Sequence, residues 1–244
     1  MRNFMALTGR EMRSIFLSPL AFGAAVMFLF VFGLVFTANF NRTHLVQIET
    51  LVQPIGYILP MLIAPLLTMR LLAEEKRQGT LEMLLTAPVG DIEVILSKFA
   101  GTLIFYGALL ALTCVHFFAM FLFYKGPVDW GGFFAGYLGM LLIAGQFIAF
   151  GLFVSGLFEN SVMAALVSFV AGLLVMLSDL MTSSNLLFKQ GGTARDVFQF
   201  MLPYKHFLNL VHGFCDTGDL AYFVLTTGYF LFLGVKSLES RKWL

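Results

Sequence analysis

The stretch RLLAEEKRQGTLEMLLTAPVGDIEVILSK, residues 70–98, is the densest block of charge in the sequence. Apolar runs long enough to cross a bilayer lie on both sides of it, so the whole stretch, up to Lys98, is expected to form an aqueous loop between two spans. Gly79 interrupts a charged helical pattern, and Thr80 can cap a second short helix. Because Pro88 ends that helix, the pattern predicts a short amphipathic helix that a soluble partner could grip.

Residues 74–89, EEKRQGTLEMLLTAPV, resemble the segment that follows the second span in the ABC-2 family of ATP-binding-cassette transporter permeases. The resemblance implies a coupling helix region that docks on a separate ATPase subunit. The residues expected at that contact are Glu74, Glu75, Lys76, Arg77, Gly79, Thr80, Leu81, Glu82, Leu84 and Leu85. The alternative is a stop-transfer loop whose charges hold two helices in register. A plain loop has no need of a capped helix, which favours the coupling interpretation.

The composition is that of a membrane protein. Hydrophobic residues make up 59% and charged residues 12% of the chain, and its mean hydropathy is +0.88, whereas soluble domains carry about 25% charged residues. The net charge of +1 says nothing about nucleic acid, but the sequence has no basic stripe, so no nucleic-acid partner is expected. The two cysteines are far apart and predict neither a disulfide framework nor a zinc site. We expect a single transmembrane domain over residues 1–244, in contact with membrane lipid.

The fold class expected from the hydropathy pattern is an all-α integral membrane protein with six transmembrane helices. Residues 1–18 place their apolar side chains on one face and are followed by Pro19, which predicts an amphipathic elbow helix in the membrane interface. Three prolines in the second span, Pro54, Pro60 and Pro65, predict kinks or an irregular start. The predicted spans are residues 20–38, 51–72, 99–123, 133–157, 162–180 and 220–236.

The distribution of positive charge predicts the orientation of the chain. Six spans place both termini on one side of the membrane. With the termini inside, the cytoplasmic segments hold ten of the fifteen Lys and Arg side chains, as the positive-inside rule requires. We therefore expect a multi-pass protein of the bacterial inner membrane with cytoplasmic termini and a cytoplasmic coupling helix between spans two and three.

Residues 181–219 form the second informative stretch. Within them, residues 194–214 read as one or two short outer amphipathic helices between spans five and six, broken near Pro203. ABC-2 permeases have such helices as an outer gate, and the resemblance implies gate residues at Pro203, His206, Phe207 and Gly213. Residues 202–225 are similar to the gliding-motility branch, and the nitrous-oxide-reductase-maturation branch fits less well. An interfacial connector without a gating role is the alternative, because amphipathicity alone does not discriminate.

A few polar and small side chains lie inside the predicted spans. His116 and Gln146 are expected to be hydrogen-bonded packing rather than ligands, and Asp179 to be an interfacial carboxylate that snorkels. Small residues on spans four and five predict close helix contacts, and packing within the subunit is favoured over a dimer contact. These small residues are Gly132, Gly136, Ala164, Ser168 and Gly172.

The sequence has no GxxxxGK[ST] phosphate loop and no catalytic motif, so we expect a transport subunit that is not an enzyme. It would bind no cofactor, and ATP and Mg²⁺ would belong to the partner ATPase. The resemblance implies two ATPase copies, a second permease that is identical or paralogous, and a possible outer-side auxiliary protein. The predicted function couples ATP hydrolysis to substrate export or force transmission. The alternative is a mechanical or signalling subunit that moves no solute.

Overall fold

The computed structural model describes residues 2–43, 48–79, 90–123, 130–183 and 193–239. Within these ranges the fold is helical and contains no strand, and six helices are long and apolar enough to cross a membrane. The predicted fold class is therefore confirmed. The elements are α1 Arg2–Phe16, α2 Pro19–Thr43, α3 Ile48–Thr68, α4 Ala73–Arg77, α6 Asp91–Phe123, α7 Trp130–Leu157, α8 Ser161–Ser183, α9 Thr193–Met201, α10 Pro203–Val211 and α11 Thr217–Glu239.

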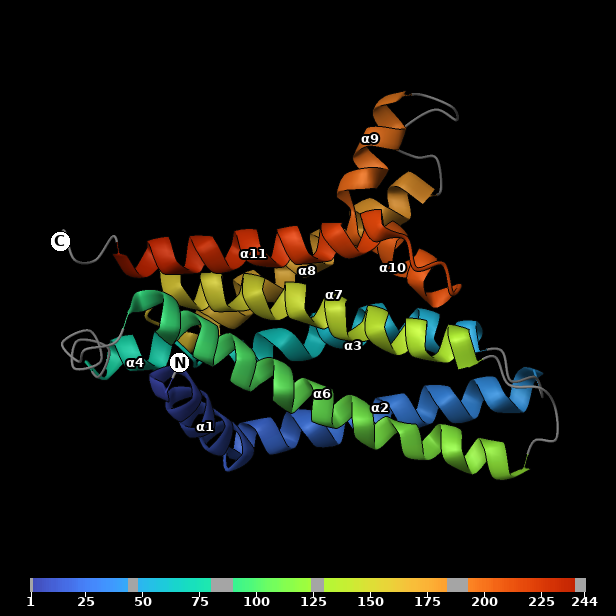
Figure 1. Ribbon diagram of the computed structural model, residues 1–244, viewed down its shortest axis with the longest axis horizontal. Coiled ribbons are helices and arrows are strands. Elements are labelled where there is room, and N and C mark those ends of the chain that lie inside the picture. Colours follow the sequence, from blue (N-terminus) through green and yellow to red (C-terminus); the bar gives the residue numbers. More distant parts are fainter. Residues whose placement is uncertain (1, 44–47, 80–89, 124–129, 184–192, 240–244) are drawn as a thin grey trace.

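Helix α7 is the centre of the bundle, with α3, α6, α8, α10 and α11 packed around it (Figure 1). Its glycines and alanines let these neighbours approach closely. A Cβ at Gly151 would lie 2.2 Å from Thr68 Oγ1 of α3, so only a glycine fits there without displacing Thr68. Added Cβ atoms at Gly136 and Gly172 would meet Val52 and Met61 of α3. The small-residue faces of spans four and five therefore make contacts within the subunit, as favoured from the sequence.

Helix α1 lies at an angle to α2, at the end of the bundle that also holds α4 and both termini (Figure 1). Its Ile15 and Glu11 are buried against the bundle, whereas Phe16 and the following Leu17 are exposed. This two-faced pattern suits a helix at a polar–apolar boundary. Its placement in the interface stays a prediction.

One helix boundary and the surroundings of one side chain differ from those expected. Helix α3 passes through its prolines without a break but ends at Thr68, before the predicted limit at residue 72, and α4 follows after a turn. Lys98 lies in α6, near its start at Asp91, and is buried, whereas the stretch up to Lys98 was expected to be exposed to water. That expectation was wrong because hydropathy averages over a window and does not register one cation paired by its neighbours.

The segment after α8 forms two helices, α9 and α10, which meet at Pro203 where a break was expected. Pro203 stands in the first turn of α10, where its missing N–H costs no helical hydrogen bond. Figure 1 shows α9 projecting away from the bundle and α10 lying against it. The two helices therefore have different surroundings, although their sequences are similarly amphipathic.

Candidate functional site

At the break between α3 and α4, one serine from the central helix α7 hydrogen-bonds the backbone. The backbone N–H groups of Leu72 and Ala73 donate to Ser155 Oγ at 3.2 and 3.1 Å, and the Ser155 hydroxyl donates to the Met69 carbonyl at 3.2 Å. A helix break leaves backbone groups without helical partners, and water cannot reach this buried position. Ser155 satisfies three of these groups and thereby fixes α4 to α7.

Helix α4 ends at Arg77, two residues before Gly79, where the charged pattern was expected to stop. Gly79 has φ +69°, in the left-handed region that favours glycine, and its N–H donates to the Lys76 carbonyl at 3.2 Å. The predicted interruption is confirmed. Thr80, Leu81, Glu82, Leu84 and Leu85 lie outside the described residues, so the second short helix stays a prediction.

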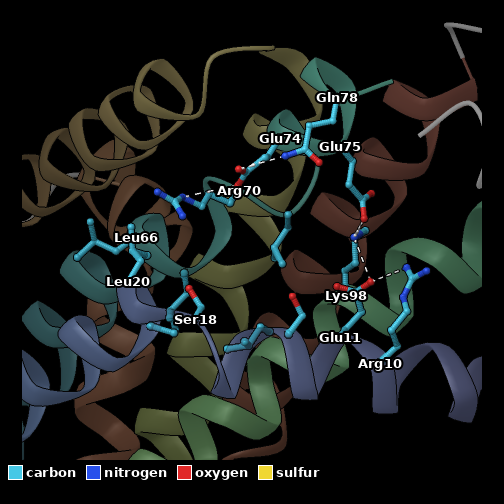
Figure 2. A pocket seen from close by; sticks show the side chains of 15 residues that line it. Arg10, Glu11, Ser18, Leu20, Leu66, Arg70, Glu74, Glu75, Gln78 and Lys98 are labelled. Carbon is cyan, nitrogen blue, oxygen red and sulfur yellow. Dashed lines mark hydrogen bonds and ion pairs between the residues drawn. The ribbon is translucent and has the colours of Figure 1, made fainter. Parts of the chain in front are cut away.

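Three helices meet at Lys98. Its Nζ lies 2.7 Å from Glu75 Oε1 of α4 and 3.3 Å from Glu11 Oε1 of α1, and the lysine side chain is 2% exposed. We call Glu11, Glu75 and Lys98 the Lys98 cluster (Figure 2). A buried charge is costly unless it is paired, so the three side chains hold α1, α4 and α6 in one arrangement. Arg10 adds a second cation, with Nη2 2.9 Å from Glu11 Oε1.

The structure separates the four charged residues of α4 that the resemblance placed at the ATPase contact. Glu75 points toward Lys98, and its side chain is 24% exposed. Arg77 is 69% exposed and pairs loosely with Glu74, which also faces Arg70 at 3.7 Å. Glu11 and Lys98 were not singled out from the sequence as site residues. The available signal for Lys98 was its position directly before the predicted third span, which begins at residue 99.

A cavity of about 530 Å³ lies beside the Lys98 cluster. Its walls come from α1, α4, α6, the start of α2 and the end of α3, and they carry side chains of both charges (Figure 2). Within the described residues, no group of three or more His, Cys, Asp or Glu side chains could hold a metal ion.

The four proposed gate residues serve as anchors within the subunit. Buried His206 faces Asp219 of α11 through Nδ1 at 2.5 Å and the Phe200 carbonyl of α9 through Nε2 at 2.8 Å. Phe207 is fully buried beside Gly56 and Gly139, and Pro203 is buried too, while Gly213 ends α10 with φ +81°. These contacts tie α9, α10 and α11 together. A gating role stays a prediction.

The surroundings or hydrogen bonds of Asp179, His116 and Gln146, three polar side chains in the spans, differ wholly or partly from those expected. Asp179 is 9% exposed and accepts a hydrogen bond from the Tyr57 hydroxyl at 3.3 Å. The expectation of a snorkelling carboxylate was wrong, because α3 supplies a donor from inside the bundle. His116 packs edge-on against Phe32 and Phe36. Its Nδ1, like Gln146 Oε1, has no hydrogen-bond partner among the described residues.

The family described as ABC-2 family transporter protein matches residues 5–235, from α1 into α11. No curated protein matches the chain.

Proposed function

The chain belongs to the ABC-2 family of transporter proteins, and from this premise we propose that it couples ATP hydrolysis by a separate subunit to export or force transmission across a bacterial inner membrane. Family membership makes the chain a membrane transport component and not the ATPase, and implies an ABC ATPase as its partner. We propose a complex of two permeases and two ATPases, with the α1 and α4 end of the bundle in the cytoplasm.

The observation that carries this proposal is the attachment of α4. Residues 80–89, the proposed coupling helix, follow α4 directly. Helix α4 is joined to α1 and α6 by the Lys98 cluster and to α7 by Ser155. Separating these helices would leave buried charges and backbone groups unpaired. A displacement of the coupling helix by the ATPase would therefore move α1, α6 and α7 together.

Two adjacent glutamates on α4 provide the test. In a complex reconstituted with the ATPase, Glu75→Ala should leave ATPase co-purification intact but abolish the change in ATP turnover that the permease causes. Glu74→Ala is the matched control for transmission, because Glu74 is outside the Lys98 cluster, and any ATPase that co-purifies with it should change its ATP turnover as with the wild type. Size-exclusion chromatography would check that both variants fold. If Glu75→Ala and Glu74→Ala caused the same change in ATP turnover, the Lys98 cluster would not transmit motion from the coupling helix.

A second pair of substitutions distinguishes docking of the ATPase from transmission of its motion through the Lys98 cluster. Glu82→Lys combined with Leu85→Ala alters the proposed docking surface and leaves the Lys98 cluster untouched. Truncation of a residue that is a hot spot of an interface costs about 2 kcal/mol or more of binding. We expect poor ATPase co-purification with normal insertion and size-exclusion behaviour. Normal co-purification with normal coupling would mean that residues 74–89 are only a charged connector.

One feature favours a second candidate, force transmission to an outer-side partner without movement of a solute. Helix α9 projects from the bundle and exposes Val197 and Met201, which share a helical face at i and i+4 (Figure 1). The resemblance of residues 202–225 to the gliding-motility branch supports the same reading. Val197→Glu with Met201→Glu should then abolish function in cells while ATPase coupling stays normal. Normal function in cells would count against this candidate.

A further inference from the structure

We propose that the cavity beside the Lys98 cluster binds the head group of a zwitterionic aminophospholipid, a phosphoethanolamine carried on two acyl chains. This inference requires a membrane-spanning chain but not the ATPase coupling proposed above. The cavity has a volume of about 530 Å³, within the range of about 300–1,000 Å³ typical of small-molecule sites.

The position of the cavity favours a lipid over a soluble ligand. It is lined where amphipathic α1 turns into the first span, by Ser18 and Leu20, and where α3 ends, by Leu66. An amphipathic helix at a span entrance lies at the depth of lipid head groups. Figure 2 shows Leu20 and Leu66 together near Arg70, away from Lys98. The cavity thus has a charged part for a head group and an apolar part for the first methylene groups of its chains.

The charges of the cavity walls cancel. Three cations, Arg10, Arg70 and Lys98, face three carboxylates, Glu11, Glu74 and Glu75. Anionic lipids are bound by clusters of uncompensated Lys and Arg side chains, which this cavity lacks. A head group with one phosphate and one ammonium matches both signs and leaves the cavity neutral.

Arg70 is the side chain best placed for the phosphate. It is 49% exposed, and its Nε stands 3.7 Å from Glu74 Oε2, beyond hydrogen-bond distance. Within the described residues its terminal nitrogens make no hydrogen bond or ion pair that would occupy them. A guanidinium fork donates two parallel hydrogen bonds to phosphate oxygens. Arg10 lines the same cavity and commits only Nη2 to Glu11.

Glu74 is the carboxylate available to the ammonium. Lys98 already occupies Glu11 and Glu75 at short distance. The contacts of Glu74 are long: its Oε1 lies 3.4 Å from the Gln78 amide and 4.0 Å from Arg77 Nη2, and its Oε2 lies 3.7 Å from Arg70 Nε. A primary ammonium has three N–H donors and can reach Glu74 while keeping other bonds. A trimethylammonium has none. The geometry therefore selects ethanolamine over choline head groups.

The test uses the purified full-length chain in detergent, without the ATPase. Native mass spectrometry and thermal unfolding would compare dioleoyl-phosphatidylethanolamine, -phosphatidylcholine and -phosphatidylglycerol with free phosphoethanolamine. We expect the ethanolamine lipid to bind most tightly and free phosphoethanolamine to compete weakly. Arg70→Gln should weaken ethanolamine-lipid binding by roughly tenfold or more, because a charge-assisted hydrogen bond is lost.

Two further variants complete the design. Glu74→Gln gives the cavity a net positive charge and should raise retention of phosphatidylglycerol relative to phosphatidylethanolamine. Arg13→Gln, which removes an exposed cation of α1 that does not line the cavity, should match the wild type. Equal binding of the ethanolamine and choline lipids, preference of the wild type for phosphatidylglycerol, or an Arg70→Gln variant that binds normally would overturn the proposal. Free phosphoethanolamine competing as well as the lipid would overturn the lipid source.

Discussion

At Lys98 the chain buries a cation near the start of a largely apolar helix and supplies its partners from two other helices. Nζ lies between Glu75 of α4 and Glu11 of α1, and Arg10 sits on the far side of Glu11. Two cations and two carboxylates therefore balance at the junction of three helices. Such an arrangement adds little net stability over apolar packing, but it is expensive to break, because the remaining groups stay buried and charged.

Removing the cation of the Lys98 cluster should cost much more folding stability than removing a cation from an exposed ion pair. Lys98→Met keeps the length of the side chain but leaves Glu75 without its cation. We expect a loss of about 3–5 kcal/mol of folding stability, as for other buried pairs from which one partner is removed. Thermal and denaturant unfolding in detergent would measure it. The control is Lys236→Met, whose partner Glu239 is at 2.6 Å in an exposed pair and is worth about 0–1 kcal/mol. Similar losses in the two variants would contradict the prediction.

At the level of helices, α7 determines where α3 ends. Its Ser155 accepts and donates the hydrogen bonds that the break after Thr68 leaves open, and its Gly151 lets α3 approach the same region. Helix α4 is thus positioned by contacts that lie far from it in sequence. A five-residue helix has no stability of its own, so its orientation depends on these neighbours.

Ser155→Ala should destabilise the fold by about 1–3 kcal/mol, since two buried N–H groups lose their acceptor. The same variant should reduce ATPase coupling, because α4 is then free of α7. Ser178→Ala is the control. The Ser178 hydroxyl donates only to carbonyls of its own helix, at 3.0 and 2.7 Å, so its loss leaves the helical hydrogen bonds intact. A melting temperature lowered equally in both variants would refute the role assigned to Ser155.

Gly151→Ala tests the close approach of α3 and α7. The new methyl group would meet Thr68 Oγ1 at 2.2 Å, and overpacking of this kind costs about 1–3 kcal/mol. Gly228→Ala in α11 meets nothing within 4 Å and should be neutral or stabilising by up to about 1 kcal/mol, from helix propensity. We expect the melting temperature to fall for Gly151→Ala and to stay the same or rise for Gly228→Ala. A stabilised Gly151→Ala variant would show that α3 and α7 are not in contact there.

For the whole molecule, both termini and α4 lie at one end of the bundle, and α9 and α10 lie toward the other (Figure 1). An even number of spans accounts for the shared end of the termini. If that end is cytoplasmic, the outer end carries a natural reporter, exposed Cys215 between α10 and α11. The other cysteine, Cys114, lies within α6.

A membrane-impermeant maleimide should therefore label the native protein in intact spheroplasts, and Cys215→Ser should abolish the label. In that background, Arg77→Cys places a thiol at an exposed position of α4 and should be labelled only after the membrane is permeabilised. Labelling of Arg77→Cys in intact cells, with none at Cys215, would invert the proposed topology.

Local properties of the sequence determined the six spans, the helix stop at Gly79 and the break at Pro203. Each depends on hydropathy over one segment or on the φ angle of one residue, so no distant partner is needed. Only the tertiary structure decided that Lys98 is buried between Glu11 and Glu75, that Asp179 turns inward to Tyr57, and that Phe207 fills the space beside two glycines. These outcomes join residues far apart in the chain. They depend on how each helix is rotated about its axis, which the packing of all the helices sets together and no single segment contains.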